Sequence, residues 1–166
     1  GLAGDAITTA NDNVAVGKGS LTADTTGAEN TAVGNVTLAF NTTGASNAAF
    51  GYGALYANTT ASNNTAIGYL SLAANTTGHS NVSVGKSSMA ANTTGLENVA
   101  MGMVSLDANT TGDYNTALGH AALSTLTTAD NNTAVGHKAL YLNTTGDRNV
   151  AVGALALDAN TTADGN

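Results

Sequence analysis

The chain has 166 residues, of which only 9% are charged and 4% aromatic, and its 11 acidic and 4 basic residues give a net charge of −7. Such a surface is neither a nucleic-acid footprint nor a basic face that seeks membranes. No apolar run approaches the roughly 20 residues that span a bilayer, and without cysteine the redox compartment stays unassigned.

A 17-residue repeat organises the sequence. The pattern Asn-x-(Ala/Ser)-(apolar)-Gly begins at residues 13, 30, 47, 64, 81, 98, 115, 132 and 149. Nine repeats therefore fill residues 13–165, residues 1–12 match the end of a preceding repeat, and residue 166 opens the next. Residues 1–166 form a single array without a capping repeat, so we expect a section of a longer rod.

The constant period predicts one identical coil per repeat. A helical repeat of this kind needs about 33 residues, so 17 residues fit one turn of a β-solenoid with two short strands and two turns. We therefore predict an all-β, parallel β-solenoid.

Each repeat opens with Asn at position 1, which we expect to stack as an amide ladder along the axis. Positions 2 to 4 alternate as a strand does, and the apolar residue at position 4 is expected to point into a core opposite Leu at position 9. Gly at position 5 permits positive φ or a close backbone approach, so it is expected to turn the corner. These structural positions include Asn30, Gly34, Leu38, Asn64, Gly68, Leu72, Asn115, Gly119 and Leu123.

Position 3 is Ala in every repeat except at Ser83. Ordering a coil costs more than the burial of one Val and one Leu returns, so a second apolar face is required. A small side chain at position 3 would let other chains approach closely around a common axis. We therefore predict a homotrimer, and a lone solenoid with an alanine-lined second layer is the alternative.

Position 6 brings similar side chains together in adjacent repeats. His120 and His137 are expected about 5 Å apart, and around a trimer axis they would supply six imidazoles for a metal. Lys, Asn and Met share this column, which favours an exposed edge, and Tyr52 and Tyr69 are expected to stack there as a surface ladder.

Positions 12 to 15 commonly hold Asn-Thr-Thr-Gly, which has the chemistry of a turn. Asn-Thr-Thr also fits the N-glycosylation acceptor pattern, but we interpret these asparagines as turn formers. Two residues apart, Asn and Thr would form two exposed rows, as in ice-binding solenoids. Against this, Thr at position 13 is equally invariant and adjacent strand residues cannot share a face, so a turn that uses both hydroxyls is the favoured interpretation. The candidate ice-binding rows are Asn41, Thr43, Asn58, Thr60, Asn75, Thr77, Asn92, Thr94, Asn109 and Thr111.

Position 16 carries a late row of acids, Asp113, Asp130, Asp147 and Asp164. The Gly-Gly-x-Gly-x-Asp repeat of calcium-binding β-rolls is absent, so a solvated loop tip is predicted. No Ser-His-Asp order and no paired Glu stand out, and a repetitive rod offers no deep cleft. We expect no enzymatic activity and no cofactor.

The stretches NNTAIG (Asn63–Gly68) and NNTAVG (Asn131–Gly136) resemble the Asn-Ser-Val-Ala-Ile-Gly motif of the head domains of trimeric autotransporter adhesins, the YadA-like family. SLAANTTG (Ser71–Gly78) is similar to that family's second strand and Gly-terminated turn. The resemblance covers all nine repeats and implies a left-handed parallel β-roll assembled as a trimer. The family coil is a little shorter, and the extra residues here fall in the Asn-Thr-Thr-Gly turn. Phage tail-fibre proteins carry similar repeats.

These features predict an extracellular fibre segment on a cell or virion surface, either a rigid spacer or an adhesive head. Its expected partners are further copies of itself and a host surface or matrix receptor of unknown identity, with no nucleic acid and no membrane. Two alternatives stay open: an ice-binding protein and a surface filament that grows by end-to-end stacking of coils.

Overall fold

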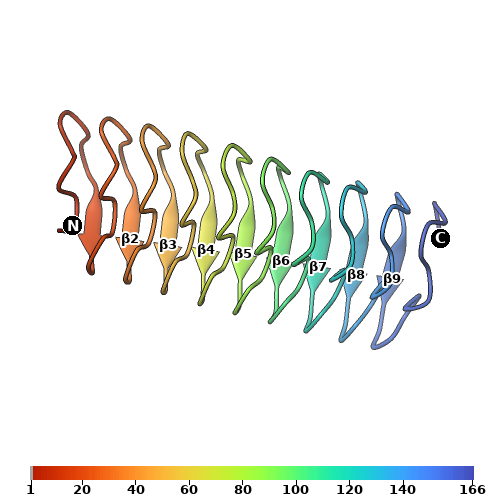
Figure 1. The fold of residues 1–166 in the computed structure, drawn as a ribbon. Coiled ribbons are helices and arrows are strands. Elements are labelled where there is room, and N and C mark those ends of the chain that lie inside the picture. The colour runs from red at the N-terminus through yellow and green to blue at the C-terminus, as the bar shows by residue number, and fades with distance from the viewer. Residues whose placement is uncertain (1) are drawn as a thin grey trace.

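The structure, a computed structural model, describes residues 2–166, which form a parallel β-solenoid (Figure 1). Nine three-residue strands make one parallel sheet in chain order, with no helix among the described residues. The strands are β1 (Val14–Val16), β2 (Thr31–Val33), β3 (Ala48–Phe50), β4 (Thr65–Ile67), β5 (Val82–Val84), β6 (Val99–Met101), β7 (Thr116–Leu118), β8 (Thr133–Val135) and β9 (Val150–Val152).

Equivalent residues of successive repeats stack directly on one another. Val33 pairs with Phe50, and Phe50 pairs with Ile67, so each coil advances the chain by 17 residues. The coils line up along one axis, and the chain ends lie at opposite ends of the rod (Figure 1). The prediction of an all-β parallel solenoid with one repeat per coil is confirmed.

Only one strand forms in each coil, so the expected second strand is wrong. In the coil of β4, Leu70 and Leu72 have φ values of 52°, which lie in the left-handed region and break an extended run. Such a conformation costs about 1–2 kcal/mol per residue. Burial of a Leu side chain contributes about 1.5–3 kcal/mol, and fully buried Leu72 also donates its N–H to the Ser88 carbonyl of the next coil (3.0 Å).

The core lies on the side of the strand opposite to the one predicted. Ala at position 3 and Leu at position 9 are fully buried, as Ala49 and Leu55 show. Position 4 was expected to point inward, but Phe50 is 39% exposed and Ile67 is 42% exposed. Positions 2 and 4 share the outer face because strand side chains alternate. Position 3 is small because it packs inside its own coil, so this alanine gives no support for a trimer, whose prediction the single chain does not test.

Gly at position 5 turns the corner as predicted. Gly68 has φ of 132°, and a Cβ placed there would lie 2.6 Å from the carbonyl oxygen of Gly85 in the next coil. Gly34 and Gly119 meet their neighbours in the same way, at 2.4 and 2.5 Å. Close stacking of backbones at this corner therefore excludes every side chain.

The buried asparagines at position 1 link successive coils chiefly through backbone groups, and the expected amide-to-amide bond forms only in some coils. Asn64 accepts the backbone N–H of Asn81 at its Oδ1 (2.9 Å) and donates its Nδ2 to the carbonyl of Gly78 (3.0 Å). Asn30 and Asn115 make the same pair of bonds with their neighbours. Each side chain thus joins the start of one strand to the turn of its own coil and to the next strand.

Candidate interaction surfaces

The asparagines at position 12 lie inside the coil. Asn75 donates its Nδ2 to the Oδ1 of Asn58 (3.0 Å) and to the carbonyl of Gly78 (2.9 Å). This is the amide-to-amide ladder that was predicted for position 1. The exposed asparagine row of the ice-binding alternative is therefore wrong for Asn41, Asn58, Asn75, Asn92 and Asn109, all of which are fully buried. Buried amides already used as donors are also closed to glycosylation in the folded chain.

The two threonines that follow have different surroundings. At position 13, Thr76 donates its hydroxyl to the Thr93 carbonyl of the next coil (3.1 Å). At position 14, Thr77 is exposed, and its hydroxyl makes no hydrogen bond within residues 2–166. The turn thus uses one hydroxyl rather than two. An exposed row remains, formed by Thr26, Thr43, Thr60, Thr77, Thr94, Thr111, Thr128, Thr145 and Thr162.

The outer face of the sheet presents an apolar stripe along the rod. We call positions 2 and 4 of β1 to β9 the outer stripe. None of its residues is charged, and position 4 is apolar in every coil. Its largest side chains are half-exposed, including Phe50, Ile67 and Met101. An exposed, largely apolar surface of this kind is a candidate interaction site.

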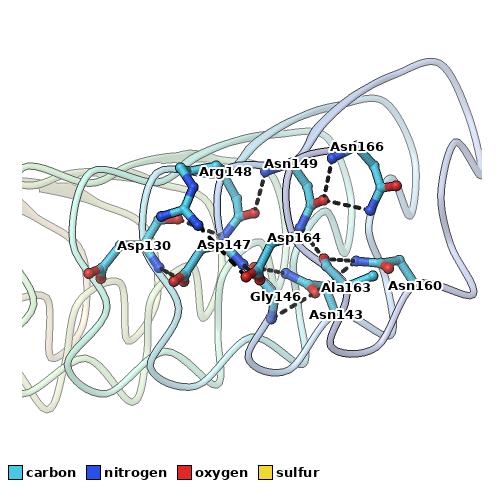
Figure 2. A network of polar contacts seen from close by, with 11 residues as sticks. Asp130, Asn143, Gly146, Asp147, Arg148, Asn149, Asn160, Ala163, Asp164 and Asn166 are labelled. Atoms are coloured by element: carbon cyan, nitrogen blue, oxygen red, sulfur yellow. Dashed lines mark hydrogen bonds and ion pairs between the residues drawn. The ribbon is translucent and has the colours of Figure 1, made fainter.

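The aspartate row at position 16 stabilises the backbone. The backbone N–H of Asp130 donates to the Oδ1 of Asp147 (2.9 Å), and that of Asp147 donates to the Oδ1 of Asp164 (2.8 Å). Figure 2 shows this row with Arg148, whose Nη2 lies 3.7 Å from the Oδ2 of Asp164. The prediction of a merely solvated loop tip missed this role. Ser62, which also occupies position 16, has the same role, because its hydroxyl accepts the N–H of Ala45 (3.0 Å).

The position-6 histidines stack as predicted. The rings of His120 and His137 lie 5.3 Å apart at an interplanar angle of 13°. Within residues 2–166, no three His, Asp or Glu side chains converge in a way that could hold a metal ion. Tyr52 and Tyr69 stack in the same column at 5.4 Å, which confirms the predicted aromatic ladder.

An aromatic groove lies beside that ladder, and sequence reasoning did not foresee it. We define the groove as two adjoining hollows of about 420 and 210 Å³ that share Val36 and Tyr56. The larger hollow also meets Phe40 and the smaller meets Tyr52. Positions 6, 7, 10 and 11 of different coils form it, so nearness along the chain does not reveal it.

Comparison with known proteins found no matching family model, no similar curated protein and no similar solved structure. The part of the chain that the structure describes contains no helix of the length and hydrophobicity needed to cross a membrane.

Proposed function

We propose that this chain is a non-enzymatic, rigid segment of a homotrimeric extracellular fibre, and that it serves as a spacer or adhesive head on a cell or virion surface. The observation that carries the proposal is the outer stripe, an uncharged and largely apolar sheet face that runs over all nine strands. The resemblance of the NNTAIG and NNTAVG stretches to trimeric adhesin heads favours three chains arranged as left-handed rolls.

Stiffness follows from the way in which the coils join. Each strand contacts only the strands before and after it, and strand hydrogen bonds are supplemented by side-chain bonds between coils at positions 1, 12 and 13. An array linked at several points around every coil resists bending. This property suits a spacer that holds an attachment site away from its surface.

Further copies of the chain are the best occupants of the outer stripe. Its residues recur once per coil, so an identical parallel chain matches it coil by coil. Full burial of one large apolar side chain contributes about 1.5–3 kcal/mol. Phe50, Ile67 and Met101 are half-exposed in the single chain, so their further burial between chains would stabilise an assembly. Three stripes around one axis close the assembly and leave no stripe open.

Solution mass tests the proposal. Sedimentation equilibrium at several concentrations should give three times the chain mass of 16.2 kDa. Replacing Ile67 and Val84 together with Asp should yield monomers that keep the far-ultraviolet spectrum of the parent, because neither side chain belongs to the buried core. The control is Thr77→Asp, an exposed change outside the stripe that should stay trimeric. A monomeric parent chain would refute the trimer.

Ice binding is a second candidate function, favoured by the exposed position-14 threonines with free hydroxyls. It predicts thermal hysteresis and shaped ice crystals, both reduced by Thr77→Leu together with Thr94→Leu. A solution with no hysteresis would exclude this function. Long fibres growing from purified chains would instead support the end-to-end filament.

A further inference from the structure

The aromatic groove has a chemistry that the proposed assembly does not use. Its residues occupy positions 6, 7, 10 and 11, whereas the outer stripe occupies positions 2 and 4. Aromatic side chains gather here in the coils of β2 to β4. Tyr52 and Tyr69 are 50% and 49% exposed, so much of their ring surface is open to a ligand.

The aromatic rings are held in fixed orientations. Phe40 and Tyr56 meet edge to face, with centroids 4.9 Å apart and an interplanar angle of 86°. Tyr69 covers one face of Tyr52 by stacking on it. The other face of Tyr52 is turned toward the preceding coil, where the shorter Asn35 occupies position 6.

Glycines at position 7 open the hollows. Gly19 and Gly53 occupy a column in which other coils carry Val36, Leu70 or Lys138. A Cβ at Gly53 would lie 2.8 Å from the Cδ2 of Leu70, and one at Gly19 would lie 3.2 Å from the Cγ1 of Val36. The space beside Tyr52 and Tyr56 therefore exists because this column lacks two side chains.

The backbone of the groove is closed to an added peptide strand. The N–H groups of position 7 are used between coils: Val36 donates to Lys18 (2.9 Å), Gly53 to Asn35 (3.0 Å) and Leu70 to Tyr52 (2.9 Å). A peptide that adds to a sheet as a further strand binds mainly through such main-chain groups. The groove instead offers side chains, and neither hollow is lined by an acidic residue.

Polar side chains stand beside the rings. Lys18 and Asn35 line the larger hollow, and their side chains make no hydrogen bond with any other residue in 2–166. A pyranose ring has one C–H-rich face and a rim of hydroxyls. Its C–H groups pack on the electron-rich face of an aromatic ring, and its hydroxyls need donors and acceptors such as an amide or an ammonium group.

We propose that the aromatic groove binds a neutral oligosaccharide, with pyranose rings against Tyr52 and Tyr56 and hydroxyls hydrogen-bonded to Asn35 and Lys18. The groove crosses the coils of β1 to β4, a span of about 14 Å at the spacing of adjacent strands, which accommodates a short run of sugar rings. The inference rests on the proposed adhesive function for its biological meaning, since it names the chemical class of the receptor. It does not require the trimer.

Titration calorimetry with the full chain tests the proposal, with chitohexaose, cellohexaose and maltohexaose as probes. Saturable binding of at least one probe is expected. Tyr52→Ala and Tyr56→Ala should each weaken it about tenfold or more by removing a stacking face. Gly53→Leu should abolish it by filling the smaller hollow, and the fold should persist because Leu70 occupies the same column with φ of 52°.

The matched control is Tyr141→Ala. Tyr141 shares position 10 with Tyr56 but lies in the coil of β8, outside the groove, so its loss should leave affinity unchanged. Failure of all three probes to bind, or equal weakening by the control, would overturn the inference. So would groove variants that change the sedimentation mass without changing affinity, because the groove would then be a subunit contact.

The two proposals fail separately. If the chain is a trimer but binds no saccharide, the proposed saccharide site is refuted and the proposed fibre is not. If the chain is a monomer that binds saccharide through Tyr52 and Tyr56, the proposed trimer is refuted and the saccharide site is supported.

Discussion

At the scale of single residues, Gly68 lies where the backbones of successive coils are too close to admit a side chain. Gly68→Val would place a Cβ 2.6 Å from the oxygen of Gly85 at φ of 132°, where β-branched residues are strongly disfavoured. We expect a loss of more than about 2 kcal/mol of unfolding free energy, measured by urea denaturation. Thr77→Val is the control and should change little. Equal stability of the Gly68 variant would show that the corner lies elsewhere.

Asp24 is a charged exception in the buried asparagine column. Burial raises the pKa of its carboxyl, and hydrogen bonds from the side chain of Asn41 and the N–H of Gly27 offset this only in part. Because the folded state raises the pKa, ionised Asp24 opposes folding above that raised pKa. The cost disappears as pH falls below the ordinary carboxyl value of about 3.9.

Asp24→Asn should therefore stabilise the chain at pH 7, by roughly 1 kcal/mol. The new Nδ2 can donate to the Gly27 carbonyl as Asn41 donates to Gly44 (2.9 Å). Denaturation at pH 7, 5 and 3 checks the sign, since the advantage should shrink as pH falls. An advantage that is constant with pH would attribute it to hydrogen bonding rather than charge.

At the scale of elements, the position-16 column sets a hydrogen-bond gain against charge repulsion. The Oδ1 of Asp130 accepts the N–H of Asp113 (2.8 Å), while like charges stacked at strand spacing repel. Asp130→Asn keeps the acceptor and removes one charge, so we expect a gain of about 0.5 kcal/mol at low salt that fades in 0.5 M NaCl as the remaining charges are screened.

Asp130→Ala is the matched comparison for that column. It removes the same charge but leaves the N–H of Asp113 without its partner, so it should destabilise the chain by about 1 kcal/mol or more. Thermal melts of both variants at two salt concentrations separate the effects. Identical behaviour of the Asn and Ala variants would show that the hydrogen bond contributes nothing.

The elements also show how far sequence reasoning reaches. A constant 17-residue period predicts stacked coils, because any drift in length would break the stacking. Because side chains alternate along a strand, either position 3 or positions 2 and 4 could face the core. The larger side chains at position 4 favoured the second choice, which is wrong. Column tolerance was the better signal: position 3 accepts only Ala or Ser, as a tight interior demands, while position 4 accepts Val, Phe, Ile, Met and Leu.

The groove and the left-handed residues lay beyond such reasoning for a different reason. Leu72 at φ of 52° contradicts the local preference of leucine, and only contacts with the adjacent coils stabilise that conformation. Lys18 and Tyr56 likewise line the same hollow of the groove although they lie far apart in the sequence. That proximity depends on how the chain winds between positions 6 and 10, which no spacing in the sequence reports.

At the scale of the whole molecule, a rod of coils that contact only their neighbours should behave as a linear array. Leu72 is fully buried near the middle, and Leu72→Ala should cost about 2–5 kcal/mol by leaving a cavity. In hydrogen exchange, the amides of Leu55, Leu72 and Met89 should lose protection, while those of Leu21 and Leu140 keep most of theirs. Thr77→Ala, which leaves the core intact, should give the parent pattern. A uniform loss of protection over all coils would show that the rod unfolds as one cooperative unit, and the description of the chain as a linear array would then be wrong.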